Sequence, residues 1–67
     1  MAKSIDVIHN GKVVTMELRP SYDWVRDLRY IAAYIAVKAD YRRYDVGKFQ
    51  TIDAAKRKCR EFMNRVL

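Results

Sequence analysis

Cysteine, histidine, proline and glycine are all scarce in this chain of 67 residues, which has one cysteine, one histidine, one proline and two glycines. A single cysteine cannot form a disulfide within the chain, and one cysteine with one histidine cannot build a zinc cluster. Low cysteine content is typical of a reducing compartment. The sequence therefore predicts a protein without metal or cofactor and with a cytoplasmic location.

Long apolar segments are missing as well. The longest relevant run, residues 31–37, is far shorter than the roughly 20 residues that span a membrane, and the opening "MAKSIDVIHN" lacks the apolar core of a secretory signal. We therefore expect no membrane partner. Residues 1–67 are expected to form one small basic domain, whose core is marginal because a chain of this size buries only about 60% of its unfolded surface. Homodimerisation would supply additional burial.

Basic residues are abundant and unevenly placed. The formal net charge is +6, from 14 lysines and arginines against 8 aspartates and glutamates. Residues 38–67 hold nine basic and four acidic residues, a net charge of +5, whereas residues 1–37 hold five and four, a net charge of +1. This asymmetry favours a polyanionic partner, most often nucleic acid, although the same charge also serves solubility.

The segment "SIDVIHNGKVVTMEL" predicts an N-terminal β-hairpin. Asn10-Gly11 between two apolar runs is the preferred two-residue type I′ turn, and it sets a register in which Val7 faces Val14. The apolar face of this hairpin needs a cover, because a lone hairpin is unstable in water. Pro20 is expected to end the second strand, since proline cannot donate to a β-ladder.

A C-terminal amphipathic helix is predicted after Thr51. Thr51 is a suitable N-cap, and Asp53 in the first turn suits the positive end of the helix dipole. Apolar residues at helical spacing define one stripe, in which Cys59 is expected to be buried. The stripe comprises Ile52, Ala55, Cys59, Phe62, Met63 and Val66.

The middle of the chain, residues 21–39, fits two structures. A helix capped by Ser21 would align Trp24 and Leu28 in an apolar stripe, and several alanines favour it. A strand would instead alternate aliphatic positions with tyrosines. One helix over residues 21–46 would run roughly 39 Å, which is too long for a compact domain of this size. A ββαβα arrangement with a helix over residues 21–39 and a sheet with two further strands both stay open on this evidence.

Residues 30–57, "YIAAYIAVKADYRRYDVGKFQTIDAAKR", resemble the second half of AP2-type DNA-binding domains and of the related arm domains of phage integrases. In those families a strand reading aromatic-Ala-Ala-x-Ile precedes a strand that ends in Gly-x-Phe-x-Thr, and a helix with an alanine in its first turn follows. The matching motifs here are "AAYI" at residues 32–35, "GKFQT" at residues 47–51 and "AA" at residues 54–55.

The resemblance implies strands over residues 30–38 and 42–49. The fold would then be α+β, with an N-terminal hairpin, two further antiparallel strands and a C-terminal helix that covers one sheet face. Residues 21–28 would form a short helix or loop, with Trp24 and Leu28 against the edge of the core.

The resemblance also implies a DNA-binding accessory protein of a phage or mobile element. Domains of this type read DNA with arginines and tryptophans on the exposed sheet face. The equivalent positions here are Tyr34, Ala36, Arg43 and Asp45, so the base-reading residues are not carried over.

Two groups of cations are candidates for phosphate contacts. The first lies between residues 38 and 48, where basic residues interleave with tyrosines, a composition that suits phosphate contacts and stacking on unpaired bases. The second lies on the predicted helix and also fits an ordinary solvated face. We expect weakly sequence-selective binding, with DNA ahead of RNA. The expected nucleic-acid-binding residues are Lys38, Arg42, Arg43, Lys48, Lys56 and Arg60.

Tyrosines define an alternative function. Tyrosine and arginine are enriched at protein-binding hot spots, and Tyr30 and Tyr34 would project beside small alanines as a flat contact surface. Together with Tyr41 they would serve a small interaction or inhibitor module that binds a larger protein, including one that handles nucleic acid. The sequence shows no nucleophile–base motif, phosphate-binding loop or metal-ligand spacing, so we do not expect an enzyme.

Overall fold

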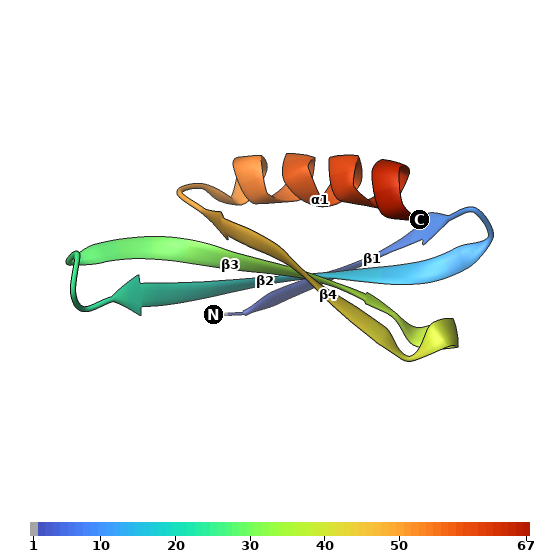
Figure 1. Cartoon of the computed structure of the whole chain (residues 1–67), viewed down its shortest axis with the longest axis horizontal. Helices are drawn as coiled ribbons and strands as arrows, with labels where there is room; N and C mark the ends of the chain where they lie inside the picture. The colour runs from blue at the N-terminus through green and yellow to red at the C-terminus, as the bar shows by residue number, and fades with distance from the viewer. Residues whose placement is uncertain (1) are drawn as a thin grey trace.

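Four antiparallel strands followed by one helix make up the computed structural model, which describes residues 2–67 (Figure 1). The sheet has the simple order β1-β2-β3-β4. This confirms the predicted α+β class, and the alternative with a helix over residues 21–39 is wrong. The elements are β1 (Lys3–His9), β2 (Lys12–Asp23), β3 (Leu28–Val37), a 3-10 turn η1 (Lys38–Asp40), β4 (Arg42–Phe49) and α1 (Ile52–Val66).

The β1–β2 hairpin has the predicted turn and register. Asn10 and Gly11 both have positive φ, 51° and 79°, as a type I′ turn requires. Val7 pairs with Val14, and the ladder continues to Lys3 opposite Leu18. Because register fixes which side chains share a face, this turn commits one whole face of the hairpin to the core.

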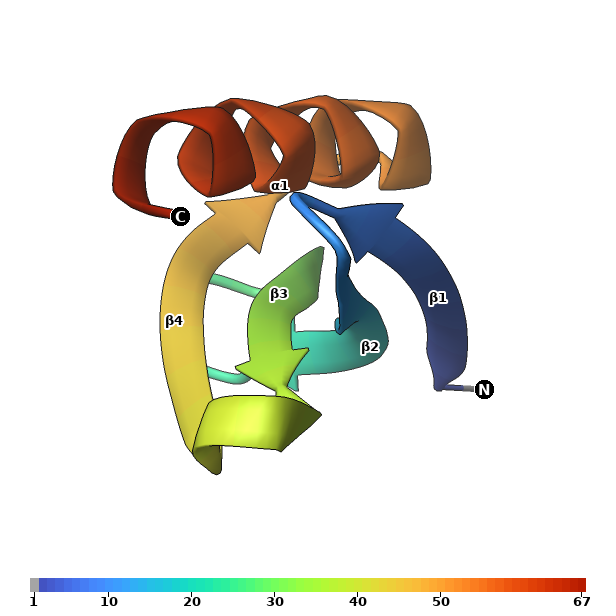
Figure 2. The same ribbon diagram turned by 90° about the vertical axis from the view of Figure 1, so that its right-hand side faces the viewer.

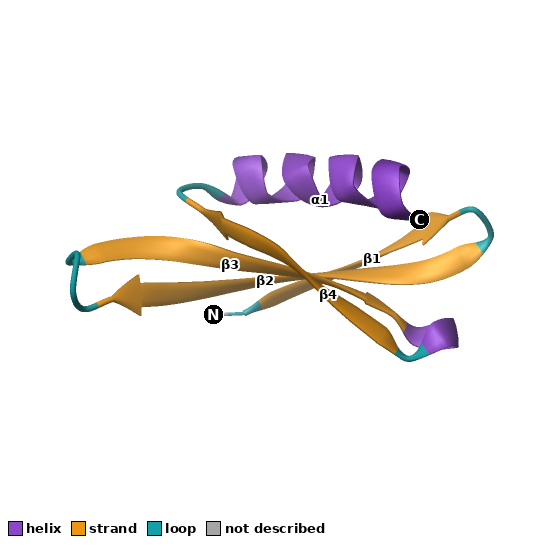
Figure 3. Cartoon of the chain, in the orientation of Figure 1, coloured by secondary structure: helices purple, strands orange, loops and turns teal. Residues whose placement is uncertain are grey.

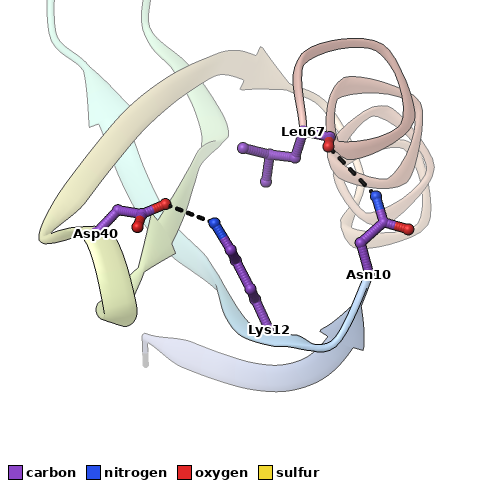
Figure 4. Close-up of polar contacts among 4 residues, drawn as sticks. All are labelled: Asn10, Lys12, Asp40 and Leu67. Carbon is purple, nitrogen blue, oxygen red and sulfur yellow. Dashed lines mark hydrogen bonds and ion pairs between the residues drawn. The ribbon is translucent and has the colours of Figure 1, made fainter.

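Two polar contacts fasten this turn to later parts of the chain (Figure 4). The Asn10 side-chain amide donates to the carbonyl of Leu67 at 3.3 Å, and Lys12 Nζ lies 3.0 Å from Asp40 Oδ2. The first contact joins the turn to the end of α1, and the second joins it to η1. The β1–β2 turn, the end of α1 and η1 are therefore held together at one end of the molecule.

The core lies between one face of the sheet and α1, which crosses above the curved strands (Figure 2). Burial of the predicted helix stripe is confirmed at Ala55, Cys59 and Met63, whereas its two end residues, Ile52 and Val66, are exposed. Thr51 Oγ1 accepts a hydrogen bond from the Ala54 amide at 3.1 Å, as an N-cap does. The buried apolar residues are Val14, Met16, Leu18, Ala33, Ile35, Val37, Ala55, Cys59 and Met63.

Strand β2 does not end at Pro20 but continues to Asp23, paired with β3 down to Leu28. The prediction failed because β1 covers β2 only up to Leu18, so the later part of β2 is an edge of a two-stranded ribbon. Proline is tolerated on such an edge. This ribbon, which we call the β2–β3 arm, projects beyond the start of α1 (Figures 1 and 3).

The expectation that Trp24 and Leu28 lie against the edge of the core is wrong. Trp24 sits in the turn of the arm with 85% of its surface exposed, and Leu28 is 48% exposed. Neither packs at the edge of the core, because the arm carries both side chains away from α1. No helix in the described part of the chain is long and apolar enough to cross a membrane.

Candidate nucleic-acid interface

The sheet face opposite α1 carries two cations stacked on tyrosines. The Arg43 guanidinium lies 4.4 Å from the centre of the Tyr34 ring, and Lys48 Nζ lies 5.0 Å from the centre of the Tyr30 ring. Arg43 also donates to Glu17 Oε2 at 2.7 Å. We call this surface the open face. Its two β4 cations are therefore already engaged by neighbours within the sheet.

Charges of both signs are interspersed on the open face. The ladder places three carboxylates there, Asp6, Glu17 and Asp45, with Arg19, Arg43 and Lys48 among them. Asp6 accepts a hydrogen bond from the largely buried Thr15 hydroxyl at 2.7 Å. Because phosphate binding depends on an excess of positive charge, this mixed surface is a poor phosphate site.

The β3–β4 corner presents the exposed side chains of Lys38, Tyr41 and Arg42. Tyr41 is 98% exposed and has a φ of 53°, in the left-handed region. A side-chain hydrogen bond with Tyr44, together with the charges of Tyr44 and Asp40, raises the pKa of Arg42 above its ordinary value. Arg42 thus stays charged at every relevant pH, and its exposed guanidinium is open to an anionic partner.

Strand alternation separates the two neighbouring arginines of β4. Arg42 pairs with Val37 and Arg43 pairs with Ala36, so their side chains point to opposite faces of the sheet. On the side of Arg42, the Tyr44 ring packs 5.5 Å from the Phe62 ring of α1, and the Arg65 guanidinium lies 6.0 Å from Phe62. Tyr44 is accordingly a packing residue.

The helix carries the densest group of cations without ion-pair partners among residues 2–67. Lys56, Arg57 and Arg60 are neighbours at spacings of three and four residues, so they share one side of α1. We call these three residues the α1 basic stripe. Lys58 differs, because its Nζ lies 3.1 Å from Glu61 Oε2. The cations in ion pairs are Lys12, Arg19, Arg26, Arg43 and Lys58.

The predicted nucleic-acid-binding residues therefore do not form one patch. Arg43 and Lys48 lie on the open face, Lys38 and Arg42 lie at the β3–β4 corner, and Lys56 and Arg60 lie on α1 in the other layer. Sequence reasoning missed Arg57, which completes the stripe with Lys56 and Arg60. Its spacing of three residues from Arg60 is visible in the sequence and is the signal that could have found it.

The predicted tyrosine surface is also divided. Tyr30 and Tyr34 share the open face, half-buried beneath Lys48 and Arg43, whereas Tyr41 stands alone at the β3–β4 corner. Beside Tyr30, at the base of the arm, is a hollow of about 220 Å³. Its lining comprises Asp23, Arg26, Leu28, Tyr30, Lys48, Phe49 and Gln50.

The turn of the arm is a further exposed feature that the sequence analysis did not identify. Trp24 and Val25 are 85% and 95% exposed, respectively. The Trp24 ring contacts the Tyr22 ring edge-on, with the ring centres 4.7 Å apart. Asp23 Oδ1 accepts hydrogen bonds from the amides of Val25, at 3.0 Å, and Arg26, at 3.2 Å. An aspartate before a four-residue turn is the sequence signal for this arrangement.

Clusters of metal-ligating side chains are not found within residues 2–67. The lone cysteine, Cys59, is buried on the inner side of α1, and this burial raises the pKa of its thiol. Comparison of the chain with protein-family models, with curated proteins and with solved structures gives no match. The resemblance to AP2-type and integrase arm domains stays a prediction.

Proposed function

We propose that this protein binds nucleic acid without catalysing a reaction, mainly through phosphate contacts of the α1 basic stripe and Arg42. The observation that carries the proposal is that these cations are free of ion pairs within the described residues, while several other cations are neutralised. Binding is weakly sequence-selective and prefers DNA to RNA. On the resemblance to integrase arm domains, the protein serves as a cytoplasmic accessory factor of a phage or mobile element.

The absence of ion pairs at these cations favours phosphate binding, because no ion pair has to be broken first. A cation held by a carboxylate loses that partner when it contacts phosphate, so part of the electrostatic gain is offset. Arg57 and Arg60 break no such contact, and each releases a condensed counterion from the nucleic acid. Lys38, also exposed and unpaired in the described structure, would add to the contact from the β3–β4 corner.

Fluorescence anisotropy of labelled duplex DNA, single-stranded DNA and RNA tests this function directly. Four phosphate contacts, from Arg42, Lys56, Arg57 and Arg60, give an expected slope of log K against log salt of about −3.6 on a duplex. Affinity should then fall roughly a hundredfold between about 50 and 200 mM salt. Absence of binding at about 50 mM salt, or binding that salt does not weaken, would overturn the proposal.

A protein-binding function is the second candidate, and the hollow at the base of the arm favours it. Leu28, Tyr30 and Phe49 supply apolar lining, and Arg26 and Lys48 supply charge. Interface anchors insert into pockets of this mixed character. The partner would be a larger protein or a second copy of the chain.

The two functions make opposite predictions in the same titration. If the function is protein binding through the hollow, no nucleic acid should bind even at low salt. Light scattering over a range of concentrations then tests for the homodimer, and Tyr30→Ala should weaken any dimer formed through this surface. A monomer at all concentrations would remove the homodimer and leave only a different protein as the partner.

A further inference from the structure

Trp24 is the only tryptophan of the chain, and it lies outside the core. Large aromatic side chains supply much of the apolar burial in a folded domain, and a domain of this size has little burial to spare. Trp24 and the adjacent Val25 are exposed and therefore add almost no apolar burial to the fold. An exposed apolar group of this kind marks a contact site.

The turn holds Trp24 in a defined position. Asp23 accepts the amide hydrogens of Val25 and Arg26, and Tyr22 contacts the Trp24 ring. A ring fixed in advance loses little conformational entropy when a ligand stacks on it. The turn of the β2–β3 arm also lies beyond the start of α1, where an extended partner reaches it without touching the core (Figure 1).

The charged residues around the turn limit which class of partner can bind there. Arg29 pairs with Tyr22 across the arm, and it makes no ion pair in the part of the chain that the structure describes. Two carboxylates, Asp23 and Asp27, border the turn, and Asp23 Oδ2 lies 4.0 Å from Arg26 Nε. The site therefore offers a flat aromatic ring with one free guanidinium on one side and negative charge at the turn itself.

A single-stranded nucleic acid fits this combination better than a duplex or a bilayer. An unpaired base exposes its ring face for stacking, and its phosphate extends to one side, where Arg29 can meet it. Bases in a duplex are already stacked, and a groove would bring two rows of phosphates toward Asp23 and Asp27. An anionic lipid surface would meet the same carboxylates.

We infer that Trp24 at the turn of the β2–β3 arm stacks on an unpaired base of a single-stranded nucleic acid, while Arg29 contacts a neighbouring phosphate. This inference rests on the proposed nucleic-acid-binding function and names its substrate class. The α1 basic stripe supplies the salt-dependent part of binding, and Trp24 supplies a contribution that salt does not weaken and that requires unpaired bases.

Emission of the single tryptophan reports this contact without a label. We would titrate the full chain with oligodeoxythymidylate of about 16 nucleotides, with a duplex of the same length and with anionic lipid vesicles. Stacking should quench Trp24 emission with the single strand and much less with the duplex. Trp24→Ala should lower single-strand affinity roughly tenfold, and Trp24→Phe should recover most of that loss. Val25→Ala is the matched control on the same turn and should change affinity less than twofold.

Each outcome separates this inference from the function on which it rests. Binding of the single strand without quenching, and with unchanged affinity for Trp24→Ala, would overturn the stacking role and leave phosphate binding intact. A blue shift of Trp24 emission with the vesicles, without quenching by the oligonucleotide, would assign the turn to a lipid surface and overturn the inference. Binding of no nucleic acid at low salt would overturn both. Because Trp24 lies outside the core, circular dichroism should show its variants folded.

Discussion

The Arg43 guanidinium donates to Glu17 at 2.7 Å while it lies over the ring of Tyr34. Both contacts join strands β2, β3 and β4 across the open face. Glu17 is the better shielded partner, with 23% of its side-chain surface exposed against 50% for Arg43. This contact between a half-exposed cation and a largely shielded carboxylate links the strands and leaves Arg43 less available to a phosphate.

We therefore expect Arg43→Ala to act on stability more than on nucleic-acid binding. Unfolding in urea should show a loss of about 0.5–1.5 kcal/mol, since the ion pair and the stacking on Tyr34 are both removed. A double-mutant cycle with Glu17→Gln should give a coupling energy of about 0.5–1 kcal/mol. The salt slope of DNA binding should stay unchanged. A slope reduced by about one would instead make Arg43 a phosphate contact.

The α1 basic stripe should behave differently. Arg57→Ala with Arg60→Ala should weaken binding of all sequences alike and reduce the salt slope by about two, because two phosphate contacts are lost. Stability should change by less than about 0.5 kcal/mol, since both side chains are exposed. Anisotropy at several salt concentrations measures the slope, and urea unfolding measures the stability.

Lys58→Ala provides a matched control on the same helix. It also removes one positive charge, but Lys58 is held by Glu61 at 3.1 Å. We expect Lys58→Ala to leave the salt slope of DNA binding nearly unchanged. Equal effects of Lys58→Ala and of each stripe variant would show that total charge, and not the position of the stripe, governs binding.

Local signals in the sequence were sufficient to predict the N-terminal hairpin and the C-terminal helix. Asn10-Gly11 admits one tight turn, and that turn alone determines the pairing of β1 with β2. Thr51 and the apolar spacing behind it likewise define α1 and the burial of Cys59. In both cases a backbone requirement and a hydrophobic pattern point to the same structure, and for this reason the prediction succeeds.

The middle of the chain could not be predicted in the same way. Its alternating and helical patterns are similar in strength, and the choice depends on whether the first hairpin offers a strand edge for pairing. The path of β2 through Pro20 depends on where β1 starts, and the exposure of Trp24 depends on how far the arm extends past α1. These are tertiary relationships that no short window of sequence contains.

The expected nucleic-acid-binding residues are distributed over several surfaces for a simpler reason. Arg42 and Arg43 are adjacent in the sequence and were assigned to one patch, but adjacent residues of a strand lie on opposite faces. The helical cations also fitted an ordinary solvated face, and Arg57, which lies three residues from Arg60, was not among the expected nucleic-acid-binding residues.

Gly47 should be the less replaceable of the two glycines. Its φ of 138° lies in a region that side chains rarely adopt, next to an irregularity in the β3–β4 ladder, and an added Cβ would lie 3.4 Å from Phe49 Cζ. Gly47→Ala should cost about 1–3 kcal/mol in urea unfolding. Gly11→Ala should cost less, about 1 kcal/mol, because the turn is open and its left-handed conformation is milder. Equal costs would contradict the strain assigned to Gly47.

Cys59 should make the free energy of unfolding depend on alkaline pH. Burial raises the pKa of its thiol in the folded protein, whereas the unfolded thiol titrates near about 8.5. Below that pH the thiol is protonated in both the folded and the unfolded state, and the free energy of unfolding has its full value. Above it the unfolded state loses its proton first, so stability falls as pH rises toward the folded pKa, by up to about 1.4 kcal/mol per pH unit.

Urea unfolding of the wild type and of Cys59→Ala between about pH 7 and 10 measures this slope. The variant should lack it. Parallel curves would mean that Cys59 is accessible enough to ionise in the folded state.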